Sequence, residues 1–293
     1  MGYKKEESVW VFDGQCRFCL FSIFWLKKTK IASDTNTCSI QNLEDTLLAL
    51  IDLERFITEI AIIDLKTREV HYGAQAILSE AAAAYPAFSL ITRYSAFRYL
   101  ADIIYKTVSY NRTIILPSSE NNKGIRCPCE PPFHCTYRIV YLIAIGIFTG
   151  ILALPLSSLW NLLTHQSFSL RSYIEVLIIL FLPVLFFLLA IRIKSDRKWD
   201  HAGHFMSHWI VLCLIWLPVA ISYIWVKSEI WMSQIIILWA LLSFILGNYL
   251  YFRRISLLKL NRWWMLTYLL LYWGTSVALL QLIGLLEALR HFT

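Results

Sequence analysis

The stretch VWVFDGQCRFC, residues 9–19, decides how the N-terminal part of this chain folds. Its first four residues are apolar and rich in valine and aromatic side chains, which is typical of a short buried strand. Asp13 and Gly14 end this strand, since Asp tolerates turn geometry and Gly adopts positive φ freely. Cys16 and Cys19 follow at the start of an apolar run that predicts a helix.

The two cysteines stand where a redox site is expected. A cysteine at the N-terminus of a helix, here predicted over Leu20–Lys28, faces unpaired N–H groups and the positive end of the helix dipole, so its thiolate is stabilised. Arg17 adds a cation that acts in the same direction, and Cys19 lies one turn from Cys16, within reach for a disulfide. This order of strand, turn, Cys-x-x-Cys and helix predicts a dithiol redox site. Two alternatives stay open: a pair of inert buried thiols, and half of a zinc site.

The motif Phe12-Asp13-Gly14-x-Cys16-x-x-Cys19 resembles the signature of the DCC family of thiol-disulfide oxidoreductases, the YuxK-like proteins. Later landmarks of that family are matched by Ser39-Ile40-Gln41, by Gly73-Ala74-Gln75-Ala76, and by Tyr105 through Asn111-Arg112. The resemblance covers residues 8–115 and implies a thioredoxin-like fold whose activity is carried by the cysteine pair. No proline precedes the strand expected at Ile57–Asp64, where thioredoxins place the cis-proline that faces their disulfide. The thioredoxin mode of substrate docking is therefore not carried over.

The composition indicates a polytopic membrane protein. Hydrophobic residues make up 58% of the 293 residues and charged residues 16%, with a mean hydropathy of +0.56. The 12 Trp and 15 Tyr are typical of aromatic belts at membrane interfaces. The net charge of +7 is attributed to loops, because no basic run interleaves with aromatics in a soluble segment, and no nucleic-acid partner is expected. The odd count of seven cysteines argues against a structural disulfide framework.

Three segments are expected along the chain. Residues 1–117 form a thioredoxin-like α/β domain, residues 118–138 a Cys/Pro-rich juxtamembrane linker, and residues 139–293 an all-α transmembrane bundle of five helices. The first segment has the order βαβ followed by ββα, and one amphipathic helix is expected over Leu43–Phe56. Five apolar segments are long enough to cross a membrane: Ile139–Leu163, Tyr173–Ile193, Phe205–Val226, Ile230–Phe252 and Trp264–Leu286.

The distribution of basic residues predicts the orientation in the membrane. The loops after the second and fourth spans are rich in Lys and Arg, and the loops after the first and third are poor. The positive-inside rule then places the N-terminal domain in the cytoplasm and Thr293 outside, in a bacterial inner membrane. A cytoplasmic dithiol is mostly reduced, which favours the reduction of a disulfide over its formation. Cys16 is expected to attack the substrate disulfide and Cys19 to resolve the mixed disulfide, while Asp13 accepts a proton or caps the helix.

The juxtamembrane linker contains a cluster of metal-ligating residue types. Three thiols and one imidazole, which lie within nine residues and are separated by prolines, are Cys127, Cys129, His134 and Cys135. They are able to close a tetrahedral zinc site, to serve as a second dithiol that exchanges with the first, or to be structural.

A second group with ligand character lies at the start of the third span. His201, His204 and His208 are spaced i, i+3, i+7, which places all three on one face of a helix. Such a face is able to bind a metal or a haem. The alternative is an interfacial histidine face that contacts lipid headgroups or another helix.

The function predicted from the sequence is a membrane-bound thiol-disulfide oxidoreductase that acts through Cys16 and Cys19. Its expected partners are the lipid bilayer and a protein or small molecule that carries a thiol or a disulfide. One alternative is a non-catalytic subunit or assembly factor of a larger membrane complex, with the redox domain as a docking module. The other is a metal- or haem-binding membrane protein built on the histidine face.

Overall fold

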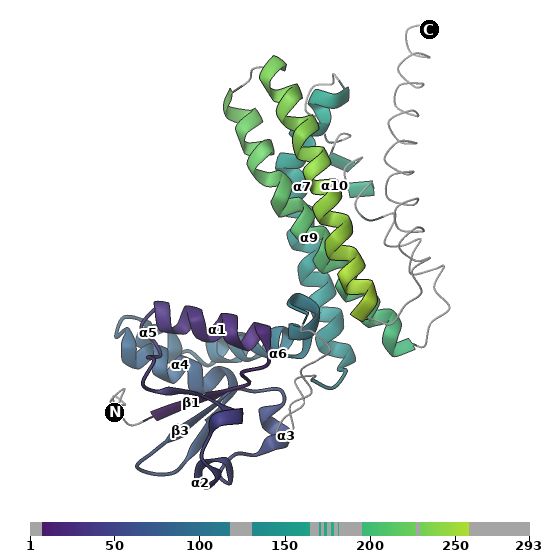
Figure 1. Cartoon of the computed structure of the whole chain (residues 1–293). Helices are drawn as coiled ribbons and strands as arrows, with labels where there is room; N and C mark the ends of the chain where they lie inside the picture. Colours follow the sequence, from purple (N-terminus) through teal and green to yellow (C-terminus); the bar gives the residue numbers. More distant parts are fainter. Residues whose placement is uncertain are drawn as a thin grey trace, which may run out of the picture. The chain divides into compact units, whose positions relative to one another are not determined.

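The computed structural model describes residues 8–117, 131–164, 170, 173–174, 177–178, 181, 195–226 and 229–257 (Figure 1). The chain divides into two units, Met1–Tyr141 and Leu142–Thr293, and each is described by itself.

The first unit is built on a four-stranded sheet of order β2-β1-β3-β4. The strands are β1 (Ser8–Phe12), β2 (Thr37–Ser39), β3 (Ala61–Asp64) and β4 (Val70–Tyr72). Strand β1 pairs in parallel with β2 and antiparallel with β3, and β3 pairs antiparallel with β4. The parallel pair requires a crossover, which the first helix supplies. The predicted mixed α/β architecture with βαβ followed by ββα is confirmed.

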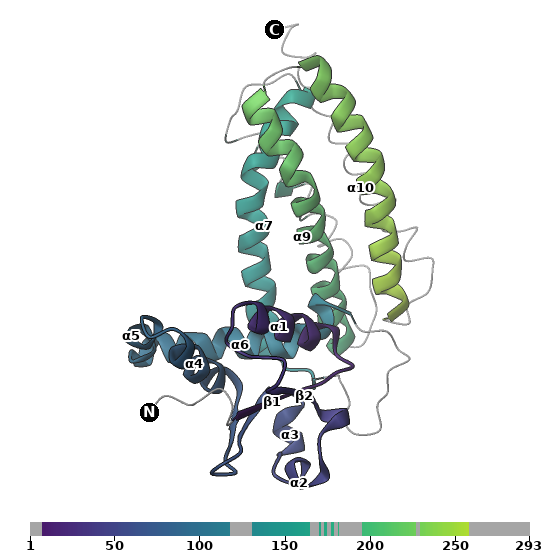
Figure 2. The same cartoon turned by 60° about the vertical axis from the view of Figure 1, so that its left-hand side comes forward.

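Helices cover both faces of this sheet. They are α1 (Arg17–Lys28), η1 (Ile40–Asn42), α2 (Asp45–Leu48), α3 (Leu53–Phe56), α4 (Gly73–Ala84), α5 (Phe88–Thr92) and α6 (Ser95–Ile115). Figures 1 and 2 show α1, α4 and α6 on one side of the sheet and α2 and α3 on the other.

The sheet has a separate hydrophobic core on each face, because successive side chains of a strand point in opposite directions. In β1, Trp10 packs into the core that contains Ile23 of α1, and Val11 packs into the core that contains Ile40 of η1. All four are nearly or fully buried. The end of β1 is therefore held from both sides where the chain turns toward the cysteine pair.

The single helix predicted over Leu43–Phe56 is wrong, since the structure has the two short helices α2 and α3 there. Asp52 is the N-cap residue of α3, and its Oδ1 accepts hydrogen bonds from the backbone N–H of Glu54 at 3.0 Å and of Arg55 at 3.2 Å. An aspartate side chain that bonds to the backbone in this way starts a new helix and interrupts one that runs through it. The strand predicted from Ile57 begins at β3, four residues later.

The second unit is helical in its described part. Helix α7 (Cys135–Thr164) begins in the first unit and crosses the boundary, and α9 (Ser195–Val226) and α10 (Glu229–Leu257) follow. Trp239 Nε1 of α10 donates a hydrogen bond to the carbonyl oxygen of Ile215 of α9 at 2.7 Å. At Gly247 of α10 an added Cβ would lie 2.9 Å from Leu212 Cδ2, so the absence of a side chain allows α9 and α10 to approach closely.

Two of the described helices contain a segment long and apolar enough to cross a membrane, Cys135–Ser157 and Trp199–Ser222. The prediction of five spans is therefore corrected to two candidate spans within the described residues. The predicted span Trp264–Leu286 and most of Tyr173–Ile193 lie outside those residues. Core helices of soluble proteins share this length and composition, so the two helices only weakly suggest a membrane association.

Candidate functional site

The cysteine pair lies at the start of α1. Cys16 is the N-cap residue of this helix, and its Sγ accepts a hydrogen bond from the backbone N–H of Cys19 at 3.4 Å. The sulfur thus occupies the position that a serine or aspartate oxygen usually takes at a helix N-terminus, beside unpaired N–H groups. Neither cysteine is in a disulfide. The alternative that Asp13 caps the helix is wrong, because Cys16 holds that position.

Asp13 instead organises the loop between β1 and α1. It is 3% exposed, and its Oδ1 accepts hydrogen bonds from the backbone N–H of Gln15 at 2.9 Å and from Gln41 Nε2 at 2.8 Å. The Gln41 Oε1 accepts a hydrogen bond from the Gly14 N–H at 3.0 Å, so one glutamine side chain fastens two consecutive loop residues. The second carboxylate oxygen, Asp13 Oδ2, is buried and has no hydrogen-bond partner among the described residues. One oxygen therefore holds the loop, and the other is able to accept a proton.

Gly14 is required for a reason that differs from the prediction. The sequence predicts a positive φ at Gly14, but among the described residues the glycine with a positive φ is Gly73, at 66°. At Gly14 an added Cβ would lie 2.9 Å from Ser39 Cβ and 3.0 Å from Gln41 Oε1. The loop therefore passes so close to the end of β2 that a side chain does not fit.

Replacement of Gly14 by Ala is expected to push the loop away from β2 and to lower the free energy of unfolding of the first unit by about 1–3 kcal/mol. Gly146 of α7 is the matched control, because no described atom lies within 4 Å of an added Cβ there. Amide hydrogen exchange of the full chain, followed over β1 and α1, measures the change. Equal protection in Gly14→Ala and wild type would contradict the close approach.

The two cysteines differ in exposure. Cys16, which is predicted to attack the substrate disulfide, is 1% exposed. Cys19 is partly exposed and lines a cavity of about 730 Å³ between α1, α4 and α6. The sulfur that a bound molecule meets first is therefore that of Cys19.

The pKa of the Cys19 thiol is raised well above its ordinary value. The main cause is the hydrogen bond with the Cys16 side chain, which keeps the proton on Cys19, and burial acts in the same direction. The guanidinium of Arg112 on α6 opposes both by lowering this pKa. Arg17, the predicted neighbouring cation, is exposed. The cation that lowers the pKa of Cys19 is Arg112 on α6, which lies far from the cysteine pair along the sequence.

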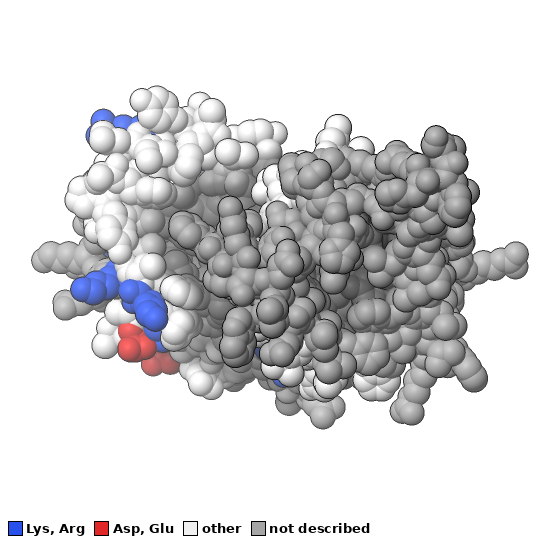
Figure 3. All heavy atoms as spheres, turned by 90° about the horizontal axis from the view of Figure 1, so that it is seen from above, with Lys and Arg blue, Asp and Glu red and all other residues white. Residues whose placement is uncertain are grey.

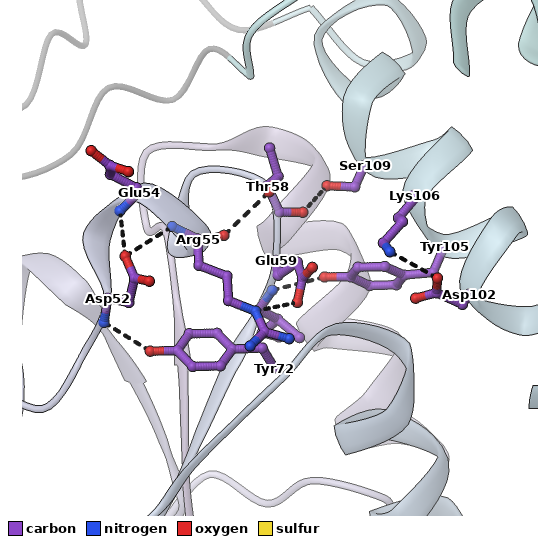
Figure 4. Close-up of polar contacts among 11 residues, drawn as sticks. Asp52, Glu54, Arg55, Thr58, Glu59, Tyr72, Asp102, Tyr105, Lys106 and Ser109 are labelled. Atoms are coloured by element: carbon purple, nitrogen blue, oxygen red, sulfur yellow. Dashed lines mark hydrogen bonds and ion pairs between the residues drawn. The ribbon is translucent and has the colours of Figure 1, made fainter. Parts of the chain in front are cut away.

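Helix α6 forms one wall of the cavity and is fastened to the segment before β3. Figure 4 shows this junction: Tyr105 Oη accepts a hydrogen bond from the Ile60 N–H at 2.7 Å, and Ser109 Oγ donates one to the carbonyl oxygen of Thr58. Both side chains leave α6 on the face that also presents Arg112 to the cavity. The position of this cation relative to Cys19 is therefore set by contacts between α6 and the start of β3.

Local sequence patterns do not indicate a role for Gln41, Tyr105 or Arg112. The structure gives each a role, because Gln41 holds the Asp13–Gly14 loop, Tyr105 anchors α6, and Arg112 lowers the pKa of Cys19. The sequence does point to all three in another way, because each belongs to a segment that resembles a later landmark of the DCC family.

The predicted zinc cluster of the linker is only partly described. Cys127 and Cys129 lie outside the described residues. Cys135 is exposed at the first residue of α7, and the His134 ring lies 5.2 Å from the Tyr110 ring and 4.6 Å from the Tyr137 ring, measured between centroids. Zinc at this cluster stays a prediction.

The three histidines of α9 are buried within the second unit. His204 Nδ1 lies 3.3 Å from Nη1 of Arg254 on α10, and a fixed guanidinium beside an imidazole opposes the binding of a second cation. His201 and His208 form no metal-binding group with it: in the part of the chain that the structure describes, no group of three or more His, Cys, Asp or Glu residues is able to hold a metal ion. The described residues therefore give no support to a metal ion held by these three histidines together, and a haem there stays a prediction.

Comparison with known proteins is informative for the first unit. Neither a search of curated proteins nor a search of solved structures finds a match to the chain. A family model does match, over a range that begins in β1 and ends just after α6, and this range contains the cysteine pair and every landmark of the resemblance. Residues 10–116 are thus similar to the family described as DCC1-like thiol-disulfide oxidoreductase, and they form a domain of that type.

Proposed function

We propose that the chain is a membrane-bound thiol-disulfide oxidoreductase that reduces a substrate disulfide through Cys16 and Cys19. The observation that carries the proposal is the hydrogen-bonded cysteine pair at the N-terminus of α1, with one sulfur on the wall of a cavity. In the first step a cysteine thiolate attacks the substrate disulfide, forms a mixed disulfide and releases one substrate thiol. In the second step the other cysteine displaces the remaining substrate sulfur. Two electrons and two protons pass to the substrate, and the protein is left with a Cys16–Cys19 disulfide.

The geometry favours Cys19 as the attacking sulfur, in contrast to the assignment made from the sequence. A substrate disulfide must touch the attacking sulfur, and the 1% exposure of Cys16 leaves no room for it. Cys19 faces the cavity, and its hydrogen bond with the Cys16 side chain raises the pKa of Cys19. Transfer of the Cys19 proton to the open oxygen of Asp13 leaves the Cys19 thiolate ready to attack, while Cys16 keeps its own proton for the second step.

Trapping of the mixed disulfide tests this assignment. The full-length chain, wild type or carrying Cys16→Ser or Cys19→Ser, is reduced, exposed to 2-hydroxyethyl disulfide, quenched with acid and mapped by peptide mass spectrometry. Wild type is expected to form the Cys16–Cys19 disulfide. Cys16→Ser is expected to hold a stable adduct on Cys19, because no second thiol is present to resolve it, and Cys19→Ser is expected to hold at least tenfold less adduct on Cys16.

The possible outcomes separate three readings of the site. If the adduct on Cys16 of the Cys19→Ser variant is as abundant as the adduct on Cys19 of the Cys16→Ser variant, or more so, Cys16 is the attacking sulfur. The proposed exchange would still stand. Failure of the wild-type pair to form a disulfide at all would overturn the oxidoreductase. It would favour the alternative of a non-catalytic subunit or assembly factor that uses this domain for docking.

The membrane location and the sidedness also belong to the proposal. The apolar composition and the two candidate spans support insertion in a bilayer. The basic residues that follow the second and fourth predicted spans support a cytoplasmic N-terminal domain. A reducing compartment keeps the pair in the dithiol form, which is the form the reductase direction requires.

A further inference from the structure

We infer that the cavity beside Cys19 is a binding site for a small lipophilic disulfide. The inference rests on the proposed exchange at Cys16 and Cys19 and names the class of substrate that this exchange serves. The cavity, of about 730 Å³, falls within the range of about 300–1,000 Å³ that is usual for small-molecule sites.

The cavity walls are mostly apolar. Three helices contribute aromatic and aliphatic side chains, and six that represent them are Phe18 and Leu26 of α1, Ile77 and Leu78 of α4, and Ala101 and Val108 of α6. A ligand with a hydrocarbon body gains free energy by leaving water for such walls. A ligand with several charges, such as glutathione disulfide, would lose its hydration against walls that are mostly hydrocarbon.

Several polar side chains of the cavity are already engaged by the protein. Tyr105 and Ser109 bond to the backbone before β3, and Glu59 Oε2 is paired with Arg55 Nε at 3.0 Å. Asp13 uses one oxygen to hold the loop. Arg112 also lines the cavity, and its charge acts on Cys19. A bound molecule therefore meets hydrocarbon over most of the walls and polar groups mainly beside the sulfur of Cys19, which favours a lipophilic body that carries a disulfide at one end.

The rim of the cavity is apolar as well. Four of its lining residues keep large apolar side chains exposed: Phe21 at 52%, Trp25 at 46%, Leu100 at 53% and Ile104 at 55%. Exposed apolar side chains that continue into a cavity are typical of a ligand entrance. Seen from above, the described surface is mostly uncharged, with few Lys and Arg in blue and few Asp and Glu in red (Figure 3).

The chemistry follows from this placement. The Cys19 thiolate attacks one sulfur of the bound disulfide, the S–S bond breaks, and the leaving sulfur takes the proton that Cys19 has lost. Cys16 then attacks Cys19 Sγ, and the second substrate sulfur leaves as a thiol with the proton of Cys16. The protein pair is oxidised by two electrons and the lipophilic disulfide is reduced to two thiols or to one dithiol.

A variant that fills the apolar part of the cavity tests the inference. Ala101 lines the cavity 11 residues before Arg112, the α6 residue whose charge acts on Cys19, and is thus about 16 Å from it along the helix axis at about 1.5 Å per residue. Ala101→Trp is therefore expected to occupy the space of the hydrocarbon body and to leave the sulfur end open. Ala83 of α4 is exposed and does not line the cavity, so Ala83→Trp is the matched control.

The probes are lipoamide, an uncharged dithiolane on an aliphatic chain, and 2-hydroxyethyl disulfide, which is small and polar. The rate of formation of the Cys16–Cys19 disulfide in the reduced full-length chain is measured for each probe, and each variant is compared with wild type. Ala101→Trp is expected to slow the reaction with lipoamide by at least about tenfold, or about 1.4 kcal/mol. Its reaction with 2-hydroxyethyl disulfide, and both reactions of Ala83→Trp, are expected to stay within about twofold of wild type.

Equal rates of wild type and Ala101→Trp with lipoamide, or an equal loss with both probes, would overturn the lipophilic site while the exchange itself stands. If the wild type reacts with neither probe, both the lipophilic site and the proposed function are overturned. Ile104→Gln provides a second variant in case the tryptophan disturbs folding. It removes an apolar wall without added bulk and is expected to slow lipoamide selectively.

Discussion

Alkylation of Cys19 by iodoacetamide is expected to be slow at pH 7 and to accelerate by about tenfold for each pH unit toward its raised pKa, because only the thiolate reacts. The increase should continue beyond about pH 8.5, where an ordinary thiol already levels off. Mass-spectrometric quantification of the Cys19 peptide of the full chain across this pH range measures the profile.

Two variants change this profile in opposite directions. Cys16→Ala removes the hydrogen bond that is the main cause of the raised pKa of Cys19, so alkylation at pH 7 should become faster. Each unit by which the pKa falls is expected to raise the rate by about threefold, since a tenfold gain in thiolate is partly offset by lower nucleophilicity. Arg112→Gln removes the cation that lowers the pKa and should slow the reaction. An ordinary profile in wild type, or the same sign in both variants, would contradict the raised pKa of Cys19 and the causes given for it.

The same pKa shift contributes to stability with a defined sign. The folded unit holds the proton of Cys19 more tightly than the unfolded chain, so the folded state is favoured while the thiol stays protonated. This contribution is fully present below about pH 8.5 and is lost as the pH rises through the raised pKa of the folded state.

Replacement of Trp10 by Ala is expected to lower the free energy of unfolding of the first unit by about 3–5 kcal/mol. Trp10 is 0% exposed and packs in the core between the sheet and α1, so its loss leaves a large cavity under the strand that leads to the cysteine pair. Domain stabilities are about 5–15 kcal/mol, so much of the unit's stability would be lost. Amide hydrogen exchange over β1 and β3 in the full chain measures the change.

Trp10→Phe is the matched control for this effect. It keeps most of the apolar volume and removes an indole N–H that has no hydrogen-bond partner among the described residues, so a cost below about 1.5 kcal/mol is expected. Equal losses in the two variants would show that the effect does not come from the cavity.

Much of the first unit follows from local sequence signals. The alternation in β1, the turn at Asp13 and Gly14 and the apolar run after Cys16 predict strand, loop and helix because each depends on neighbouring residues. The split between α2 and α3 was missed, although its cause, the capping side chain of Asp52, is also local. Apolar periodicity alone does not reveal where a polar side chain starts a second helix.

The sequence by itself determined the order of strand, Cys-x-x-Cys and helix, the position of the cysteine pair and the apolar character of the second half, since composition and spacing along the chain are sufficient for these. Only the tertiary structure decided which sulfur is accessible, which cation acts on it and what shapes the cavity. Those properties come from residues that are far apart in the chain, such as Gln41 against Gly14 and Arg112 against Cys19. Burial and electrostatic interactions depend on distances in space, and a linear pattern does not contain these distances before the chain folds.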